Sequence, residues 1–199
     1  FEVILGDSPT PTPAISFAVK AEKAAGGIVI TASHNPAAFC GYKLKGHFGG
    51  SADSETSQAV EALLDAKPVK VLDLHLAKRK RLVCVKNLHT PHARAIRKLV
   101  DFDLVANSGL RFAHDALFGV GAGAFEKILE GTRCEVTTLN GAHDPLFGGI
   151  HPEPIVHNYG PSSAYLRRHP HDLCLVTDGD ADRVGGMDGR DNALTTHQI

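Results

Sequence analysis

The chain has 199 residues, of which 43% are hydrophobic and 22% are charged, as in an ordinary globular protein. Its 21 basic and 22 acidic residues give a net charge of -1, which disfavours a general nucleic-acid-binding protein. No run of about 18 apolar residues occurs, and this excludes a membrane span. At about 150 residues per domain, the length predicts one to two domains.

The cysteines and histidines point to no disulfide framework and no zinc site. No C-x-x-C pair occurs among the four widely spaced cysteines, so we expect reduced thiols in a cytoplasmic protein. The 12 histidines include no H-E-x-x-H motif, and neither His89 with His92 nor His169 with His171 has a further ligand nearby. Surface histidines are the favoured interpretation.

In the first half, apolar segments alternate with helical patterns. Thr12 is expected to cap a helix that has Pro13 in its first turn, and Gly26 ends the pattern. In a later helix, Leu63 and Leu64 are expected to face inward. The predicted elements are a helix over 12–25, a buried parallel strand over 28–30, a helix over 54–66 and a strand over 82–85.

The second half repeats the alternation. Its predicted elements are a helix over 91–102, a strand over 110–113, a helix over 124–129, a strand over 134–139, a helix over 162–168 and a strand over 173–176. Strands separated by such helices predict an α/β fold, in which each domain is a mixed, mostly parallel sheet packed with helices. The irregular stretch 87–92 divides the chain into predicted domains 1–88 and 89–199.

The first candidate site is the segment 31–36, T-A-S-H-N-P, directly after the strand at 28–30. A serine at the carboxyl end of a parallel strand lies where α/β proteins bind ligands. Ser33 is flanked by Ala32 and His34, and this does not match the G-x-S-x-G pattern of acyl-transfer enzymes. Because Ser, Asn and Pro all favour turns, a purely structural turn is the alternative.

The second candidate site follows the strand at 173–176. Asp178, Asp180 and Asp182 alternate along the chain, so an extended backbone would point the three carboxylates the same way. Carboxylates this close repel one another unless a cation lies among them, and oxygen ligands suit a hard divalent cation. An EF-hand is excluded, because Arg183 and Gly189 occupy positions where that loop needs glycine and an acid. A solvated acidic turn is the alternative.

A third candidate is the pattern Gly119-x-Gly121-x-x-Ala124, between a predicted strand and a predicted helix. It is a permissive match to a dinucleotide-binding fingerprint. Glu135 is the acid closest to the spacing expected for ribose binding, but it begins a strand instead of ending one. A nucleotide-binding module is therefore an alternative that rests on this turn alone, and a glycine-eased turn is favoured over it.

T-A-S-H-N-P at 31–36, followed far downstream by D-G-D-A-D-R at 178–183, resembles the α-D-phosphohexomutases, the phosphoglucomutase and phosphomannomutase family. Three further segments are similar to that family. They are G-Y-K-L-K at 41–45, F-G-G-I-H-P-E-P at 147–154 and L-T-T-H-Q-I at 194–199. The resemblance implies an isomerase that interconverts hexose 1-phosphate and hexose 6-phosphate, and the segment 45–52 favours glucose as the sugar.

The resemblance also implies roles for individual residues. Ser33 would carry a phosphoryl group, pass it to the sugar-phosphate substrate, and take another back from a bisphosphorylated hexose intermediate. Mg²⁺ would be held by a phosphoserine oxygen and by three carboxylates, those of Asp178, Asp180 and Asp182. A phosphoserine adds about -1.5 to -2 charge, so a cation is needed among these groups.

Three other residues acquire expected roles in the same way. Lys43 would serve in proton transfer, which needs a depressed pKa. His34 would flank the phosphoserine. Arg183 would reach a phosphate oxygen or form a salt bridge to an aspartate. Cys40 stands where the family often has asparagine, and a thiol cannot replace the two donors of an amide.

The family has four domains around one cleft, and the loops that grip the sugar and its distal phosphate belong to the third and fourth. The chain starts at Phe1, so we expect a first domain incomplete at its N-terminus, a second domain, and little activity without domains 3 and 4. Two alternatives remain open. One is a magnesium-dependent sugar phosphatase, and the other is a non-catalytic fragment that binds Mg²⁺.

Overall fold

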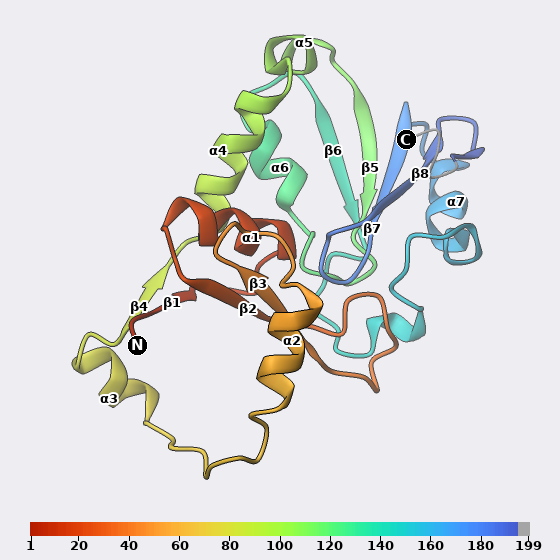
Figure 1. The fold of residues 1–199 in the computed structure, drawn as a ribbon. Coiled ribbons are helices and arrows are strands. Elements are labelled where there is room, and N and C mark those ends of the chain that lie inside the picture. The colour runs from red at the N-terminus through yellow and green to blue at the C-terminus, as the bar shows by residue number, and fades with distance from the viewer. Residues whose placement is uncertain (195–199) are drawn as a thin grey trace.

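The computed structural model describes residues 1–194. Most of the motif at 194–199 therefore lies outside the described residues. The chain forms a mixed α/β structure, in which the first half carries two strand pairs and the second half carries one larger sheet (Figure 1). None of the helices in the described part is both long enough and apolar enough to cross a membrane.

The first half divides its strands into two pairs. β1 pairs with β4 in parallel, and β2 pairs with β3 in antiparallel register, with Val29 opposite Lys43. This half is mixed, as expected, but its strands form one parallel and one antiparallel pair instead of one mostly parallel sheet, because β2 and β3 run in opposite directions on either side of the loop 31–41. The elements are β1 (Val3–Gly6), α1 (Thr12–Ala21), β2 (Gly26–Ile30), β3 (Tyr42–Gly46), α2 (Ser54–Glu61), α3 (Leu74–Arg79) and β4 (Val83–Lys86).

The second half builds a five-stranded sheet in the order β6-β5-β7-β8-β9. β5 pairs in parallel with β6 and β7, as predicted, and β8 and β9 add antiparallel strands. The helices are α4 (His89–Leu99), α5 (Phe102–Asn107), α6 (Ala124–Leu129) and α7 (Gly160–Leu166), with 3-10 turns at Phe147–Gly149 and Val156–Asn158. The strands are β5 (Arg111–Asp115), β6 (Glu135–Leu139), β7 (Leu173–Thr177), β8 (Val184–Asp188) and β9 (Ala193–Leu194).

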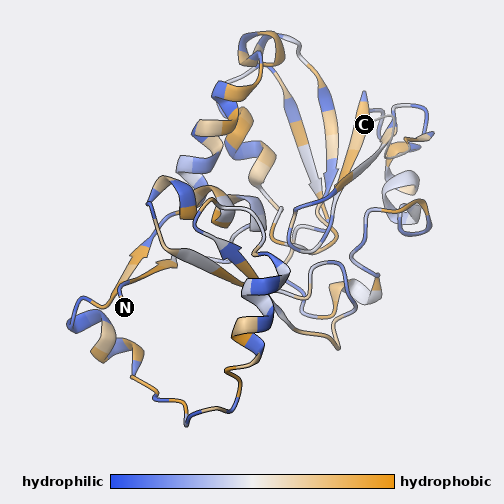
Figure 2. Cartoon of the chain, viewed as in Figure 1, coloured by the Kyte–Doolittle hydropathy of each residue, from blue (hydrophilic) through white to orange (hydrophobic). Residues whose placement is uncertain are grey.

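The helix predicted over 54–66 ends earlier and faces differently. α2 stops at Glu61, and none of its residues is buried. Leu63 and Leu64, expected to face inward, are 71% and 63% exposed. Apolar residues also recur along the chain between α2 and α3 (Figure 2), where Val69 is 88% exposed. The inward-facing interpretation was wrong, because no element within residues 1–194 covers Leu63 and Leu64.

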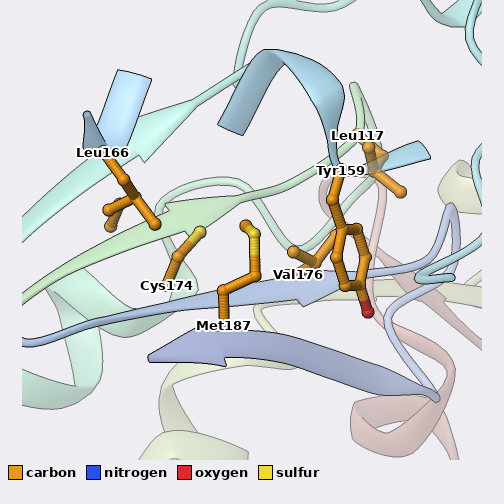
Figure 3. Close-up of a cluster of buried hydrophobic side chains, with 7 residues drawn as sticks. Leu117, Tyr159, Leu166, Cys174, Val176 and Met187 are labelled. Atoms are coloured by element: carbon orange, nitrogen blue, oxygen red, sulfur yellow. The ribbon is translucent and has the colours of Figure 1, made fainter. Parts of the chain in front are cut away.

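The best-packed region lies between α7 and the large sheet (Figure 3). Met187 from β8 lies beside Cys174 and Val176 from β7, and Tyr159 and Leu166 pack against them from the α7 side. Such a contiguous contact cluster marks the hydrophobic core of a domain. It anchors β7, and the loop that leaves the carboxyl end of β7 carries the three aspartates.

Candidate active site

Two loops from opposite halves of the chain meet at the predicted site. One joins β2 to β3 and carries Ser33, and the other joins β7 to β8 and carries the aspartates. The Ser33 hydroxyl donates a hydrogen bond to Asp180 Oδ1 at 3.2 Å, although the two residues are 147 positions apart. The structure thus brings together the two segments that the sequence singled out.

The serine loop holds Ser33 in an unusual backbone conformation. Ser33 has a φ of 56°, in the left-handed region that few non-glycine residues adopt. Its N–H donates to Thr31 Oγ1 at 2.8 Å, and Asn35 Nδ2 donates to Ala32 O at 2.8 Å. Asn35 therefore shapes the loop, and the turn projects the Ser33 side chain towards the aspartates.

A close backbone approach joins the two loops. A Cβ added to Gly179 would lie 2.6 Å from Ser33 O, closer than real Cβ atoms come to backbone. Gly119 packs against the other side of the same loop, where an added Cβ would lie 2.7 Å from Gly179 O. The glycine-rich turn weighed as a nucleotide fingerprint therefore has a packing role, because it lets the backbone at 119 touch the aspartate loop.

The three carboxylates converge through a turn, and not through the extended backbone that the alternation suggested. Asp178 Oδ1 accepts hydrogen bonds from the N–H groups of Asp182 and Arg183, at 3.0 and 3.1 Å. Ala181 adopts a φ of 55°, which wraps the chain around Asp178. One oxygen from each of Asp178, Asp180 and Asp182 consequently lies within 4.8 Å of the others.

Asp178 is the most buried of the three. Its carboxylate is fully buried, and its Oδ2 has no hydrogen-bond partner within residues 1–194. Burial, together with the neighbouring charges of Asp180 and Asp182, raises the pKa of Asp178 to about 6. Its nearest cation is Arg183 Nε, at 3.9 Å. A buried carboxylate oxygen without a hydrogen bond is costly in a protein interior, and a bound cation is one way to satisfy it.

Lys43 lies at the centre of the site. Its ammonium group donates to Asp180 Oδ2 and Asp182 Oδ2, each at 2.7 Å, and to Ser33 Oγ at 3.2 Å. Burial alone would lower the pKa of Lys43, but the hydrogen bonds to these aspartates outweigh it and raise the pKa. The depressed pKa expected for a base is thus absent while Lys43 pairs with both aspartates.

Thr12 has a role that the sequence analysis missed. Pro11, and not Thr12, is the N-cap residue of α1. The Thr12 hydroxyl is buried and donates to Asp180 Oδ2 at 2.6 Å, and its N–H donates to Asp180 O at 3.0 Å. Burial alone would raise the pKa of Asp180, but the hydrogen bonds from Lys43, Thr12 and Ser33 lower it. No local pattern signals a contact that spans 168 positions.

Arg183 and His34 form a second group at the rim. Arg183 Nη2 donates to His34 Nδ1 at 2.6 Å, so this ring nitrogen is the acceptor. Glu153 lies beside both, 3.5 Å from Arg183 Nη1 and 3.9 Å from His34 Nε2. The nearest aspartate contacts of Arg183 Nε, to Asp178 and Asp182, are both 3.9 Å. Glu153 belongs to a segment that resembled the family, but no role was assigned to it from the sequence.

The donor set fits a hard divalent cation. Three carboxylate oxygens converge, one buried oxygen lacks a partner, and oxygen ligands are those that Mg²⁺ prefers. The Ser33 hydroxyl stands beside Asp180, where a phosphate on that oxygen would join the same cluster. The residues present are therefore suitable for Mg²⁺ next to a phosphoserine.

Two family models match the chain in tandem. The phosphoglucomutase/phosphomannomutase α/β/α domain I matches residues 1–69, and domain II of the same family matches residues 90–191. The chain belongs to the phosphoglucomutase/phosphomannomutase family. The residues of the serine loop fall within the domain I match, and those of the aspartate loop fall within the domain II match.

Curated relatives in this family carry several sugar names. A phosphoglucosamine/phosphogalactosamine mutase of Sulfurisphaera tokodaii is 29% identical over 87% of this chain and 38% of its own length. A phosphoglucomutase/phosphomannomutase of Thermococcus kodakarensis is 31% identical over 89% of this chain and 38% of its own length. The chain thus spans about two-fifths of the length of these relatives.

Solved structures share the fold of this chain. A predicted phosphomannomutase of Thermus thermophilus superimposes with a TM-score of 0.90 at 32% identity, over 99% of this chain and 44% of that one. The phosphoglucomutase parafusin of Paramecium, in an open form, shares the fold with a TM-score of 0.76 at 22% identity, over 96% of this chain and 41% of that one. The α/β fold class inferred from the sequence is confirmed.

Proposed function

We propose that the protein is a phosphohexomutase that interconverts hexose 1-phosphate and hexose 6-phosphate through a phosphoserine at Ser33. The observation that carries this proposal is the meeting of the Ser33 hydroxyl with Asp180 and Lys43. This places an oxygen nucleophile, a carboxylate cluster and an ammonium group within hydrogen-bond distance of one another. Phosphoryl transfer needs mainly such positioning and charge stabilisation.

In the proposed reaction, Ser33 Oγ gives up one phosphoryl group and later takes another back. The bond between phosphorus and Oγ breaks as a bond forms to a hydroxyl oxygen of the sugar phosphate, and the proton of that hydroxyl ends on Oγ, which becomes the serine hydroxyl. The bisphosphorylated sugar then reorients, and its other phosphoryl group returns to Oγ, while the oxygen it leaves regains a proton. The phosphoserine is restored, and the substrate 1-phosphate has become the 6-phosphate.

Asp178, Asp180 and Asp182 are the residues proposed to hold Mg²⁺, together with an oxygen of the phosphorylated Ser33. When bound, Mg²⁺ would offset the negative charge of these groups and polarise the phosphoryl oxygens. The orphaned Oδ2 of Asp178 supports this assignment. The buried Thr12 hydroxyl fixes the orientation of Asp180 in the set.

The neutral amine of Lys43 is proposed to take the proton from the attacking hydroxyl and to pass it to Ser33 Oγ, because Lys43 Nζ lies 3.2 Å from that oxygen. Engagement of Asp180 and Asp182 by Mg²⁺ would remove the ion pairs that raise the pKa of Lys43. Arg183 and His34, joined by a hydrogen bond at the rim, are proposed to contact phosphate oxygens.

The complete reaction is proposed for a longer protein. The curated relatives are more than twice the length that this chain covers, so loops from other domains would complete the grip on the sugar. Without those loops the sugar phosphate would be poorly oriented, and the activation free energy would rise by several kcal/mol. We place the domain boundary between Leu88 and His89, where β4 has ended and α4 begins, and we expect residues 1–199 alone to turn over poorly.

The experiment is a mutase assay on the intact protein with the 1-phosphates of glucose, mannose and glucosamine, supplied with Mg²⁺ and a hexose bisphosphate. Isomerisation that is lost in Ser33→Ala, but kept in the control Ser51→Ala, supports the proposal. Hydrolysis without isomerisation would instead indicate the sugar phosphatase. Full isomerase activity in Ser33→Ala would contradict the role of Ser33.

A further inference from the structure

A cavity of about 530 Å³, which Ser33 does not line, lies between the start of α1 and the helices α4 and α6. Figure 1 shows α4 and α6 side by side, with α1 near their lower ends. α4 lines the cavity with one face, which includes His89, Ala93 and Arg97, and α6 lines it with Phe125 and Ile128. A volume of several hundred Å³ is typical of a site for a small organic ligand.

The charges at the rim favour an anion. Arg94 and Lys127 are exposed there, and neither forms an ion pair with any residue of the described chain. Arg97 is also basic, but its guanidinium is already engaged by Ile128 O and Glu130 O, at 2.7 and 2.9 Å. Glu130 is the one acidic residue among the described lining residues. The lining therefore has a net positive charge and two cations available to a ligand.

The walls favour a ligand that also has an apolar ring. Pro13, Ile96, Phe125 and Ile128 are half-buried and line the cavity. His114 lies in the same wall, fully buried, with Nε2 3.0 Å from Thr177 Oγ1 and with no partner for Nδ1 within residues 1–194.

We propose that this cavity binds a small organic phosphate of nucleoside-monophosphate size. Its ring would lie against Phe125 and Ile128, and its phosphate would be held by Arg94 and Lys127. Inorganic phosphate alone would leave the apolar wall unused, and an uncharged nucleoside would leave the two cations unused. The binding site does not depend on the proposed mutase activity.

The cavity also reaches the back of the aspartate loop. Its lining includes Thr177, directly before Asp178, and Ala181, between Asp180 and Asp182. Pro11 and Pro13, on either side of Thr12, line it as well. A ligand in the cavity would therefore lie against residues of the loop that positions the carboxylates. Ligand binding in the cavity is therefore expected to change the affinity of the aspartates for Mg²⁺. This coupling rests on the proposed Mg²⁺ site, and thermodynamic linkage requires Mg²⁺ to change the ligand affinity by the same factor.

Binding is tested by calorimetric titration of the intact protein with AMP, adenosine and inorganic phosphate as probes. AMP is expected to bind at least about tenfold more tightly than either of the others. Arg94→Gln and Lys127→Gln are each expected to weaken AMP binding about tenfold, or about 1.4 kcal/mol. Lys98→Gln is the matched control, because Lys98 is an exposed residue of α4 outside the cavity. Absence of AMP binding, or equal effects of Arg94→Gln and Lys98→Gln, would overturn the proposal.

A second set of measurements distinguishes AMP binding in this cavity from AMP binding at the proposed active site. AMP bound at the catalytic site would be displaced by glucose 1,6-bisphosphate and weakened by Arg183→Gln, and either result overturns the proposal. Mg²⁺ affinity is then measured with and without saturating AMP, and a change of at least about threefold is expected. An unchanged Mg²⁺ affinity would remove the coupling, whereas loss of mutase activity alone leaves the AMP titration interpretable.

Discussion

The serine loop and the aspartate loop are in close contact at Gly179, so adding one methyl group there tests how their spacing affects activity. In Gly179→Ala, the new Cβ would meet Ser33 O at 2.6 Å, where ordinary contact begins at 3.4 Å. The neighbouring atom is backbone and cannot rotate away, so the serine loop and the aspartate loop must separate by about 0.8 Å. A misplacement of roughly 1 Å costs about 100-fold in rate when reacting groups must be aligned.

We therefore expect Gly179→Ala to lower the mutase rate of the intact protein about 100-fold, while its circular dichroism and cooperative unfolding stay close to those of the parent. Gly160→Ala is the control, since a Cβ at Gly160 meets nothing within 4 Å and its φ is not positive. The assay follows formation of hexose 6-phosphate under saturating Mg²⁺. A Gly179→Ala rate within threefold of the parent would refute the argument that this backbone contact sets the position of Ser33.

Three further predictions concern stability. Thr12→Val removes the buried hydrogen bond to Asp180, so urea unfolding should show a loss of about 1.5–3 kcal/mol; Thr12→Ser should keep most of it, and equal losses would contradict this role. The pKa of Asp178 is raised to about 6 in the folded state, so the free energy of unfolding of the metal-free protein should fall as pH rises from about 4 to 6. Asp178→Asn should flatten this slope, and parallel pH profiles of the variant and the parent would contradict the raised pKa. Tyr159→Phe removes the hydroxyl that donates to Pro154 O at 2.7 Å and should cost about 1 kcal/mol, unlike Tyr165→Phe, whose hydroxyl has no partner in the described residues.

The serine loop and the aspartate loop could be predicted from the sequence because each is a continuous motif directly after a strand. The strands β5, β6 and β7 were also predictable, since each is a short segment with apolar or β-branched residues next to a helix. β8 was missed because Gly185 and Gly186 interrupt its apolar pattern. Both glycines are needed there, since a Cβ at Gly186 would meet Cys174 O at 2.8 Å and one at Gly185 would meet the Tyr159 hydroxyl.

Contacts between distant segments were beyond the reach of local patterns. Threonine is a residue type typical of a helix N-cap, and only the fold shows that the Thr12 hydroxyl donates to Asp180 instead. Lys43 was identified by its place after the serine, but its distance from the aspartates depends on the antiparallel register of β2 and β3. Likewise, Leu63 and Leu64 show a helical apolar pattern, and only the arrangement of the neighbouring elements decides whether such a face is covered.

The central claim is that Ser33 is the phosphoryl carrier of this site. The direct measurement is peptide mapping by mass spectrometry, after incubation of the intact protein with isotopically labelled glucose 1,6-bisphosphate and Mg²⁺. One labelled phosphate is expected on the peptide that contains Ser33. It should be released to added hexose phosphate and be absent when Mg²⁺ is chelated. Label found reproducibly on another residue, with Ser33→Ala labelled to the same extent, would contradict the central claim.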